Sequence, residues 1–462
     1  MPAIITKDFR IQNANQFSES FSESADTYYL AIGRPQAFAN DQAFNDGTDT
    51  SPPTPVDSVG SVDYYVYDDL LSAKKISSSN VSAVIPRRNW TTGTTYDYYR
   101  HDYGEINSAG NTITANSGAT TLHDATFYVM NSTFDVYKVI DNNGDSASTV
   151  EPTGNKSTSV FSTGDSYKWK YMYSLSASEQ ANFLSTDFMH VSTESTDYST
   201  TAGAIENAKV TAGGSGGTNG TYTNVDIRGD GSSGKATVVV SSNAVTSVTI
   251  TTAGSGYTFA SVLASDIGSV SGADIDFIIS PPGGHASDAV AELGGFFVMM
   301  NVDFATSESG EFNTSNDFRR IALLRNPTDS TTGSTATAST LDATKSITFS
   351  GTPGSFQADE KITQASSGAV GFVVDFNSTT KVLRYIQPQF TNQGVDSNGN
   401  LTAFSSTNTV TGATSGATGT PSSHDITPEL TADSGDILYI ENRKPISRAS
   451  DQTENVKLIV EF

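Results

Sequence analysis

Short apolar segments separated by turn residues recur along the chain, and this pattern predicts a protein built mainly from β-strands. Residues 27–32 are dominated by apolar and aromatic side chains and are followed by Gly33, which predicts a buried strand. Residues 127–130 and 136–140 are segments of the same kind, and residues 141–144 have the composition of a turn. Several short strands are therefore expected in the first half of the chain.

Three further segments show clear periodicity. Residues 167–175 alternate Tyr and Trp with Lys and Met, which predicts a half-buried strand with one aromatic face. Apolar residues recur at helical spacing over residues 59–70, behind the capping residues Asp57 and Ser58, which predicts a helix. Residues 176–184 begin with Ser-Ala-Ser-Glu, a capping box that predicts a second, shorter helix.

The composition supports a β-rich chain of more than one domain. At 462 residues the chain is long enough for two or three compact units. Only 16% of residues are charged and 39 are glycine, which favours strands and turns over long helices. The 19 Tyr and 24 Phe can fill several cores between β-layers. The expected fold class is mainly β, with a few short helices.

Changes in composition divide the chain into five segments. Residues 1–205 are mixed and aromatic-rich, residues 283–328 are dense and apolar, and residues 425–462 form a compact region of C-terminal strands. Residues 206–282 and 329–424 are rich in Gly, Ser and Thr. The first group is expected to build one core, and the two Gly-rich segments are expected to be small β-modules inserted into it.

Both Gly-rich segments repeat internally. In the second, the pattern that runs from Phe356 to Gly371 recurs at constant spacing from Phe404 to Gly419. In the first, Gly-Thr-Tyr-Thr at residues 220–223 is echoed later by Gly-Tyr-Thr. Repeated short strands with glycine turns are typical of small β-repeat modules and carry no chemistry by themselves.

The charge and the absence of cysteine restrict the function. With 50 acidic and 26 basic residues the formal charge is −24, so the chain repels nucleic acid and anionic lipid, and neither is an expected partner. The chain has no cysteine, which removes disulfides, thiolate metal sites and cysteine nucleophiles. No signal peptide is recognisable, and no apolar segment approaches the ~20 residues of a membrane span.

One glycine-rich motif has the spacing of a phosphate-binding loop. Residues 229–235 (GDGSSGK) fit that spacing, but Ala236 replaces the Ser or Thr that would hold magnesium. A strand pattern follows where a helix would be needed, so a β-turn is the better interpretation. Residues 228–230 spell Arg-Gly-Asp, a tripeptide too short to be informative.

No catalytic, cofactor or metal site is predicted. Residues 141–145 resemble the start of a calcium loop, but Pro152 stands where the closing Glu belongs. His285 has Ser287 and Asp288 close in sequence, although members of a catalytic triad seldom are sequence neighbours. The other histidines lack metal-ligand spacing. The chain is therefore expected not to be an enzyme.

The segment 83–90 (AVIPRRNW) stands out, because Arg and Trp are frequent at interface hot spots. Arg87, Arg88 and Trp90 are candidates either for a protein interface or for an internal clamp on aromatic or acidic neighbours, and both alternatives stay open.

This segment also resembles the Ala-Val-Ile-Pro-Arg-Arg-Asp-Trp stretch of the baseplate wedge subunit called gene product eight in T-even-like contractile-tailed phages. Asn89 stands where that family has Asp, and Lys444 stands where it has Pro. Further motifs of the family follow in the same order, at residues 32–34 (IGR), 55–59 (PVDSV), 164–169 (GDSYKW), 318–321 (FRRI), 326–327 (NP), 440–446 (IENRKPI) and 451–454 (DQTE).

The resemblance covers residues 1–200, 285–328 and 425–462, and the two modules look like additions typical of cyanophages. It implies a layered β-sandwich that forms a homodimer in the virion, within the tail baseplate, after assembly in the host cytoplasm. Wedge subunits called gene products six, seven and ten would be its neighbours. The subunit would cement the wedge and move with it during baseplate rearrangement and sheath contraction. The expected interface or clamp residues are Arg34, Arg87, Arg88, Trp90, Arg443 and Asp451.

Two other functions remain as alternatives. A tail-fibre or adhesin-like protein would use the β-repeats to bind glycans, although these repeats lack the aromatic platforms expected for that role. A polysaccharide-cleaving enzyme would need two carboxylates converging in a cleft, and no such pair stands out.

Overall fold

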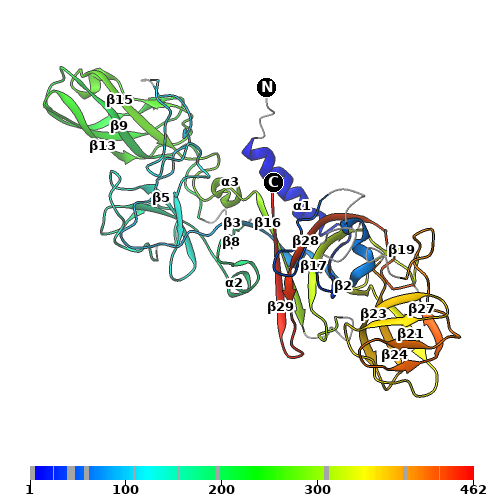
Figure 1. Ribbon diagram of the computed structural model, residues 1–462. Helices are drawn as coiled ribbons and strands as arrows, with labels where there is room; N and C mark the ends of the chain where they lie inside the picture. Colours follow the sequence, from blue (N-terminus) through cyan, green and yellow to red (C-terminus); the bar gives the residue numbers. More distant parts are fainter. Residues whose placement is uncertain are drawn as a thin grey trace. The chain divides into compact units, whose positions relative to one another are not determined.

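The computed structural model describes residues 6–23, 25–38, 47–56, 62–107, 110–154, 156–192, 198–305, 312–388, 394–425 and 427–462. The fold class is mainly β, as predicted: antiparallel sheets dominate and helices are few and short (Figure 1). The chain divides into two compact units. Unit 1 contains Met1–Gln16, Ser82–Met299 and Ile459–Phe462, and unit 2 contains Phe17–Val81 and Met300–Leu458.

The central sheet of unit 1 has the strand order β4-β5-β7-β6. Its strands are β4 (Tyr128–Met130), β5 (Asp135–Asp141), β6 (Phe161–Ser162) and β7 (Lys168–Ser174). The prediction that β7 is half-buried was wrong, because all five of its inner residues are buried. Lys170 is 0% exposed, and its amine donates to the carbonyl of Ser157 at 2.8 Å. A lysine on the face of a strand that the sequence predicts to be exposed can thus be buried when a backbone carbonyl accepts a hydrogen bond from it.

The helices of the described chain are short. They are α1 (Lys7–Ser20), α2 (Ala177–Phe183) and α3 (Ala289–Leu293). The predicted capping box of α2 is present: the hydroxyl of Ser176 accepts from the amide of Glu179, whose carboxylate accepts in return from the amide of Ser176. A further sheet has the order β29-β16-β3-β8, with β3 (Val81–Pro86), β8 (Phe188–His190), β16 (Phe297–Ala305) and β29 (Thr453–Glu461).

Residues 205–279 of unit 1, here called the first module, surround a hydrophobic core of their own, which includes Val238, Tyr257 and Phe277. Their three sheets have the orders β10-β12-β13, β15-β9 and β11-β14. The strands are β9 (Ile205–Ser215), β10 (Gly220–Asp226), β11 (Arg228–Gly229), β12 (Lys235–Ser241), β13 (Ala244–Thr252), β14 (Ala260–Ser261) and β15 (Ser271–Ile279), with the 3-10 helix η3 (Ala264–Ile267) between the last two.

The main sheet of unit 2 has the order β20-β2-β1-β17-β28. Its strands are β1 (Tyr28–Gly33), β2 (Leu70–Ile76), β17 (Phe318–Arg325), β20 (Thr340–Asp342) and β28 (Asp436–Ile446). Strand β1 is buried at every residue, which confirms the buried strand predicted at 27–32. The short paired strands β18 (Thr328–Asp329) and β19 (Ser334–Thr335) follow β17 in sequence. The turn η2 (Ser78–Asn80) connects β2 to β3.

The helix predicted over residues 59–70 is present as a 3-10 helix and ends one residue earlier than predicted. Residues 62–69 form the 3-10 helix η1 (Val62–Asp69), and Leu70 already begins β2. Asp57 and Ser58, the predicted caps, lie outside the described residues. The carbonyl of Asp69 accepts from the amide of Arg34 at 2.8 Å, so it serves the neighbouring strand instead of continuing a helix.

Residues 345–425 of unit 2, here called the second module, form a seven-stranded sheet with the order β26-β25-β22-β23-β24-β21-β27. The strands are β21 (Lys345–Phe349), β22 (Lys361–Gln364), β23 (Ala369–Asn377), β24 (Val382–Ile386), β25 (Val410–Gly412), β26 (Thr418–Gly419) and β27 (Pro421–Asp425). The two sequence repeats are the hairpins β22–β23 and β25–β26. They pair with each other, with Thr363 opposite its repeat counterpart Thr411.

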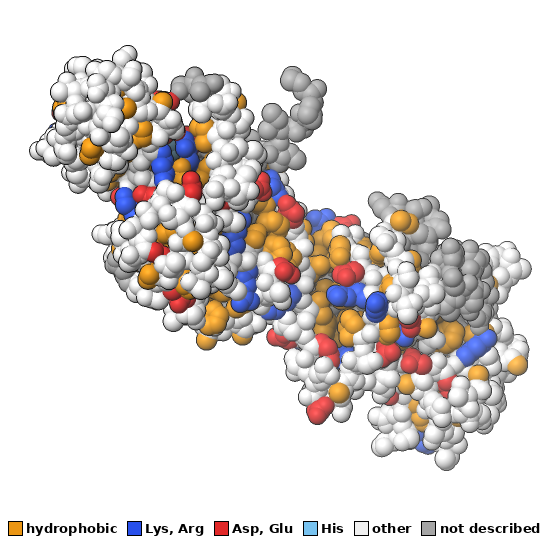
Figure 2. Space-filling view, turned by 60° about the vertical axis from the view of Figure 1, so that its left-hand side comes forward, with side chains coloured by type: hydrophobic (Ala, Val, Ile, Leu, Met, Phe, Trp, Pro, Cys, Tyr) orange, Lys and Arg blue, Asp and Glu red, His pale blue; other side chains and the backbone are white. Residues whose placement is uncertain are grey.

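Both modules have cores of their own, and uncharged polar side chains and backbone cover most of their visible surface (Figure 2). That they are insertions into a host fold stays a prediction, as do the five segment boundaries drawn from composition.

Candidate structural clamps and interface residues

Arg87 follows β3 directly and holds the segment after α2. Its guanidinium donates to the carbonyl of Ser185 at 2.8 Å and to the side-chain oxygen of Asn89 at 3.0 Å. Its backbone amide donates to the carbonyl of Asp187 at 2.7 Å. These bonds extend the pairing of β3 with β8 beyond the end of both strands.

Arg88 and Trp90 contact other parts of unit 1. The Arg88 guanidinium donates to the carbonyls of His123 and Ala125 and lies 4.5 Å from the centre of the Tyr128 ring. Guanidinium stacking of this kind adds packing and electrostatic attraction. The Trp90 indole donates to the hydroxyl of Ser148 at 3.1 Å. Arg87, Arg88 and Trp90 thus all make clamp contacts within unit 1, and their role at a subunit interface stays a prediction.

Arg34 belongs to a buried ionic cluster of unit 2. The side chains of Arg34, Asp69 and Arg320 are at most 1% exposed, and Arg320 donates to Asp69 at 2.9 Å. Arg34 lies 3.8 Å from the same carboxylate and stacks over Phe38. Arg320 also donates to the amide oxygen of Asn442 at 2.9 Å. The cluster ties η1, β17, β28 and the end of β1 together, and the motifs at residues 32–34, 318–321 and 440–446 are the sequence signals that pointed to it.

Arg443 and Asp451 lie on the surface of unit 2, apart from the Arg34 cluster. Arg443 is 48% exposed and lies 3.5 Å from Glu441 on the same strand, a pair that contributes little stability in water. Asp451 is exposed between β28 and β29. Their contacts therefore leave both side chains accessible to a partner.

Sequence reasoning missed a second buried ionic cluster, which lies in unit 1. Lys138 on β5 is 0% exposed and pairs with Glu292 on α3, which is 3% exposed. The Glu292 carboxylate also accepts from the amides of Ala286, Ser287 and Asp288 at 3.0–3.2 Å. Burial lowers the pKa of Lys138, and Glu292 opposes that shift. No spacing in the sequence connects residues so far apart.

His285, which was weighed with Ser287 and Asp288 as a catalytic triad, lies close to this cluster. His285 is 1% exposed and packs edge-on against Tyr99 at 4.9 Å. Burial, reinforced by Lys138, holds its pKa well below the usual range, so the ring is neutral at pH 7. Ser287 donates to the carbonyl of Pro282 instead. Asp288 caps α3 by accepting from the amide of Ala291 at 2.9 Å.

Lys170 allows a test by pH. Burial lowers its pKa from the usual 10.5 to about 8, so between these values the unfolded chain binds more protons than the folded chain. Stability therefore rises with pH through that window, and the penalty is fully present below pH 8. We expect Lys170→Met to be more stable than the wild type at pH 7, with the difference shrinking toward pH 9.5. Urea unfolding at both pH values measures this; a constant difference would contradict it.

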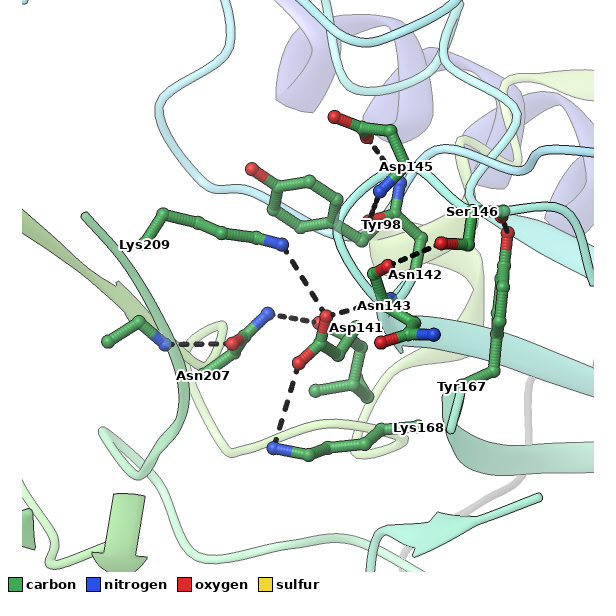
Figure 3. A network of polar contacts seen from close by, with 12 residues as sticks. Tyr98, Asp141, Asn142, Asn143, Asp145, Ser146, Tyr167, Lys168, Asn207 and Lys209 are labelled. Atoms are coloured by element: carbon green, nitrogen blue, oxygen red, sulfur yellow. Dashed lines mark hydrogen bonds and ion pairs between the residues drawn. The ribbon is translucent and has the colours of Figure 1, made fainter. Parts of the chain in front are cut away.

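A polar network joins the first module to the central sheet of unit 1 (Figure 3). Asp141, at the end of β5, lies 3.5 Å from Lys209 of β9 and 3.7 Å from Lys168 of β7. Asn207 of β9 donates to the carbonyl of Ile140 at 2.9 Å. Residues 141–145, which resembled a calcium loop, thus form a turn whose first carboxylate meets two lysines.

A second ion pair fixes the same junction. Arg100 donates to Asp102 at 2.7 Å and to Asp276 of β15 at 2.9 Å, and its side chain is 7% exposed. Arg100 and Lys209 therefore attach both strands of the β9–β15 pair to the rest of unit 1.

The glycine-rich motif is a turn, as expected. Asp230 accepts from the amide and hydroxyl of Thr258, and the strand β12 starts directly at Lys235. Within the described ranges, no three His, Asp or Glu side chains gather as a metal site. No helix in the described part of the chain is long and apolar enough to cross a bilayer.

These features describe a β-rich protein whose buried charged clusters hold its own strands and helices together. Residues 3–146 match the family model described as Bacteriophage T4, Gp8, which confirms over that segment the resemblance to the gene product eight type of baseplate wedge subunit. A search of curated proteins gives no match. The matched segment contains Arg34, Arg87, Arg88 and Trp90.

Proposed function

We propose that the chain is a homodimeric, non-enzymatic subunit of a contractile-tail baseplate wedge. It would cement neighbouring wedge subunits of the gene product six, seven and ten types and move with them during sheath contraction. It would be assembled in the host cytoplasm, with no nucleic acid or membrane as partner. The observation that carries the proposal is the Gp8 match over residues 3–146.

The internal contacts suit a mechanical part. Buried charge clusters such as Arg34–Asp69–Arg320 are geometrically demanding, because each charge needs its partner in place. Arg87 and Arg88 bind backbone carbonyls, which fixes loops that a load would otherwise displace. The first module is attached by ion pairs at its base, so it would transmit force to the central sheet of unit 1.

The absolute mass of the purified chain in solution tests the dimer. Light scattering at low and moderate salt should give twice the chain mass of 48.7 kDa. Raised salt should weaken contacts with other wedge subunits, because the chain carries a net charge of −24 and such contacts are screened. A stable trimer would favour a fibre instead, and a monomer at every concentration would contradict the dimer.

The alternative is a glycan-binding fibre or adhesin that uses the modules. Phe259, which is 61% exposed in the first module, is a side chain on which a sugar ring could stack. Binding of host-surface polysaccharide by the full chain, lost in Phe259→Ala, would support this alternative.

A further inference from the structure

Strand β28 stands out on unit 2 because it exposes apolar side chains along a strand edge. Ile437, Leu438 and Tyr439 are 38%, 43% and 41% exposed, which is unusual for three consecutive large apolar residues. One side of β28 pairs with β17, and no described strand pairs with the other side. An uncovered edge with apolar side chains is a surface that another β-strand can extend.

The charges along β28 favour a second copy of the same strand. Asp436 stands at one end of β28, where one of its carboxylate oxygens accepts from Arg325 at 2.6 Å, and Arg443 and Lys444 stand near the other end, all three exposed. Two copies related by a two-fold axis run antiparallel at an edge-to-edge contact. The acidic end of each copy then approaches the basic end of the other, while the apolar residues lie between them. Opposite charges across such a contact specify its register.

The backbone geometry restricts the register further. Residues directly opposite in an antiparallel pair have the same hydrogen-bonding direction, and that direction alternates along a strand. A symmetric pair must therefore be centred on a residue and not between two residues. Register shifts against β17 bound the regular stretch to residues 439–442. Centring on Ile440 places Tyr439 opposite the partner's Glu441 and directs Asp436 toward the partner's Lys444.

We infer that the free edge of β28 is the two-fold contact between copies of this chain, with Ile440 on the axis. The inference rests on the proposed homodimer and specifies its surface. The shifts in register, with Lys444 and Pro445, end the pairing and keep it from continuing into open-ended aggregation.

Cysteine cross-linking tests this register, since the chain has no cysteine of its own. Tyr439→Cys and Glu441→Cys are co-expressed as full-length chains and oxidised. Opposite residues of an antiparallel pair lie about 4.5–5.5 Å apart between Cα atoms, within the range of a disulfide. We expect a cross-linked dimer from the mixture and several-fold less from either variant alone, where the cysteines meet only diagonally.

A surface variant supplies a second readout without disturbing the core. Lys444→Glu replaces the attraction between Asp436 and the partner's Lys444 by a repulsion. We expect the Kd of the dimer, measured at one fixed salt concentration, to rise about tenfold, while the thermal unfolding of the monomer stays unchanged. Lys381→Glu, the same charge reversal in the turn between β23 and β24, serves as the control. A dimer that lacks the cross-link and ignores Lys444→Glu would overturn the inference and leave the proposed function standing. A chain that never dimerises would overturn both.

Discussion

Replacing Glu292 with Leu is expected to lower the free energy of unfolding of unit 1 by about 3–5 kcal/mol, the cost of leaving one partner of a buried ion pair alone. Lys138 is 0% exposed and would keep a charge without its carboxylate. Three backbone amides, those of Ala286, Ser287 and Asp288, would lose their acceptor as well. The loop before α3 should loosen with the loss of these bonds.

Tryptophan fluorescence measures this effect in unit 1 alone, because both Trp residues of the chain, Trp90 and Trp169, belong to that unit. The matched control is Asp266→Asn, which breaks an exposed pair with Arg228 and should cost less than about 1 kcal/mol. Lys138→Met combined with Glu292→Leu should recover part of the loss. Equal losses for Glu292→Leu and the control would show that the buried pair is not needed.

Asp69→Asn is expected to destabilise unit 2 by a similar amount, about 3–5 kcal/mol. The carboxylate lies between two buried guanidinium groups, those of Arg34 and Arg320, and the neutral amide would leave them to repel each other. Because Arg320 also holds Asn442, the loss should extend to β28. Dimerisation through that strand would then weaken together with stability.

Circular dichroism reports the sheets of both units and tryptophan fluorescence reports unit 1 alone, so a loss seen only by circular dichroism belongs to unit 2. Asp69→Asn should lower the urea midpoint seen by circular dichroism and leave the fluorescence midpoint unchanged. Arg443→Ala, which removes an exposed pair with Glu441, is the matched control on the same unit and should change stability little. A shift of the fluorescence midpoint alone would refute the assignment of this cluster to unit 2.

Local sequence patterns correctly predicted the strands and helices whose conformation is determined by residues near in sequence. The strand at 27–32 and the capping box at Ser176 are recovered, since apolar runs and cap hydrogen bonds act within a few residues. The helix at 59–70 is a 3-10 helix that ends at Asp69, whose carbonyl accepts from the amide of Arg34, a residue distant in sequence. The prediction that β7 is half-buried was wrong for a related reason, because Lys170 donates to the carbonyl of Ser157 inside the protein.

The candidate residues divide in the same way. Residue type and the resemblance to a known segment singled out Arg87, Arg88 and Trp90. In the structure each of these neighbouring side chains binds a different part of unit 1. Lys138, Glu292 and Asp69 carried no signal. A buried charge is recognisable only by the partner that the fold brings to it.

The sequence by itself determined the β-rich class, the repeated hairpins of the second module and the resemblance of the first part of the chain to Gp8. These follow from periodicity, turn residues and short motifs, which are local. The tertiary structure decided which charges are buried, how the first module is attached through Asp141 and Arg100, and that no described strand pairs with the outer edge of β28. Such features depend on which distant segments meet, and that is set by the packing of the whole chain.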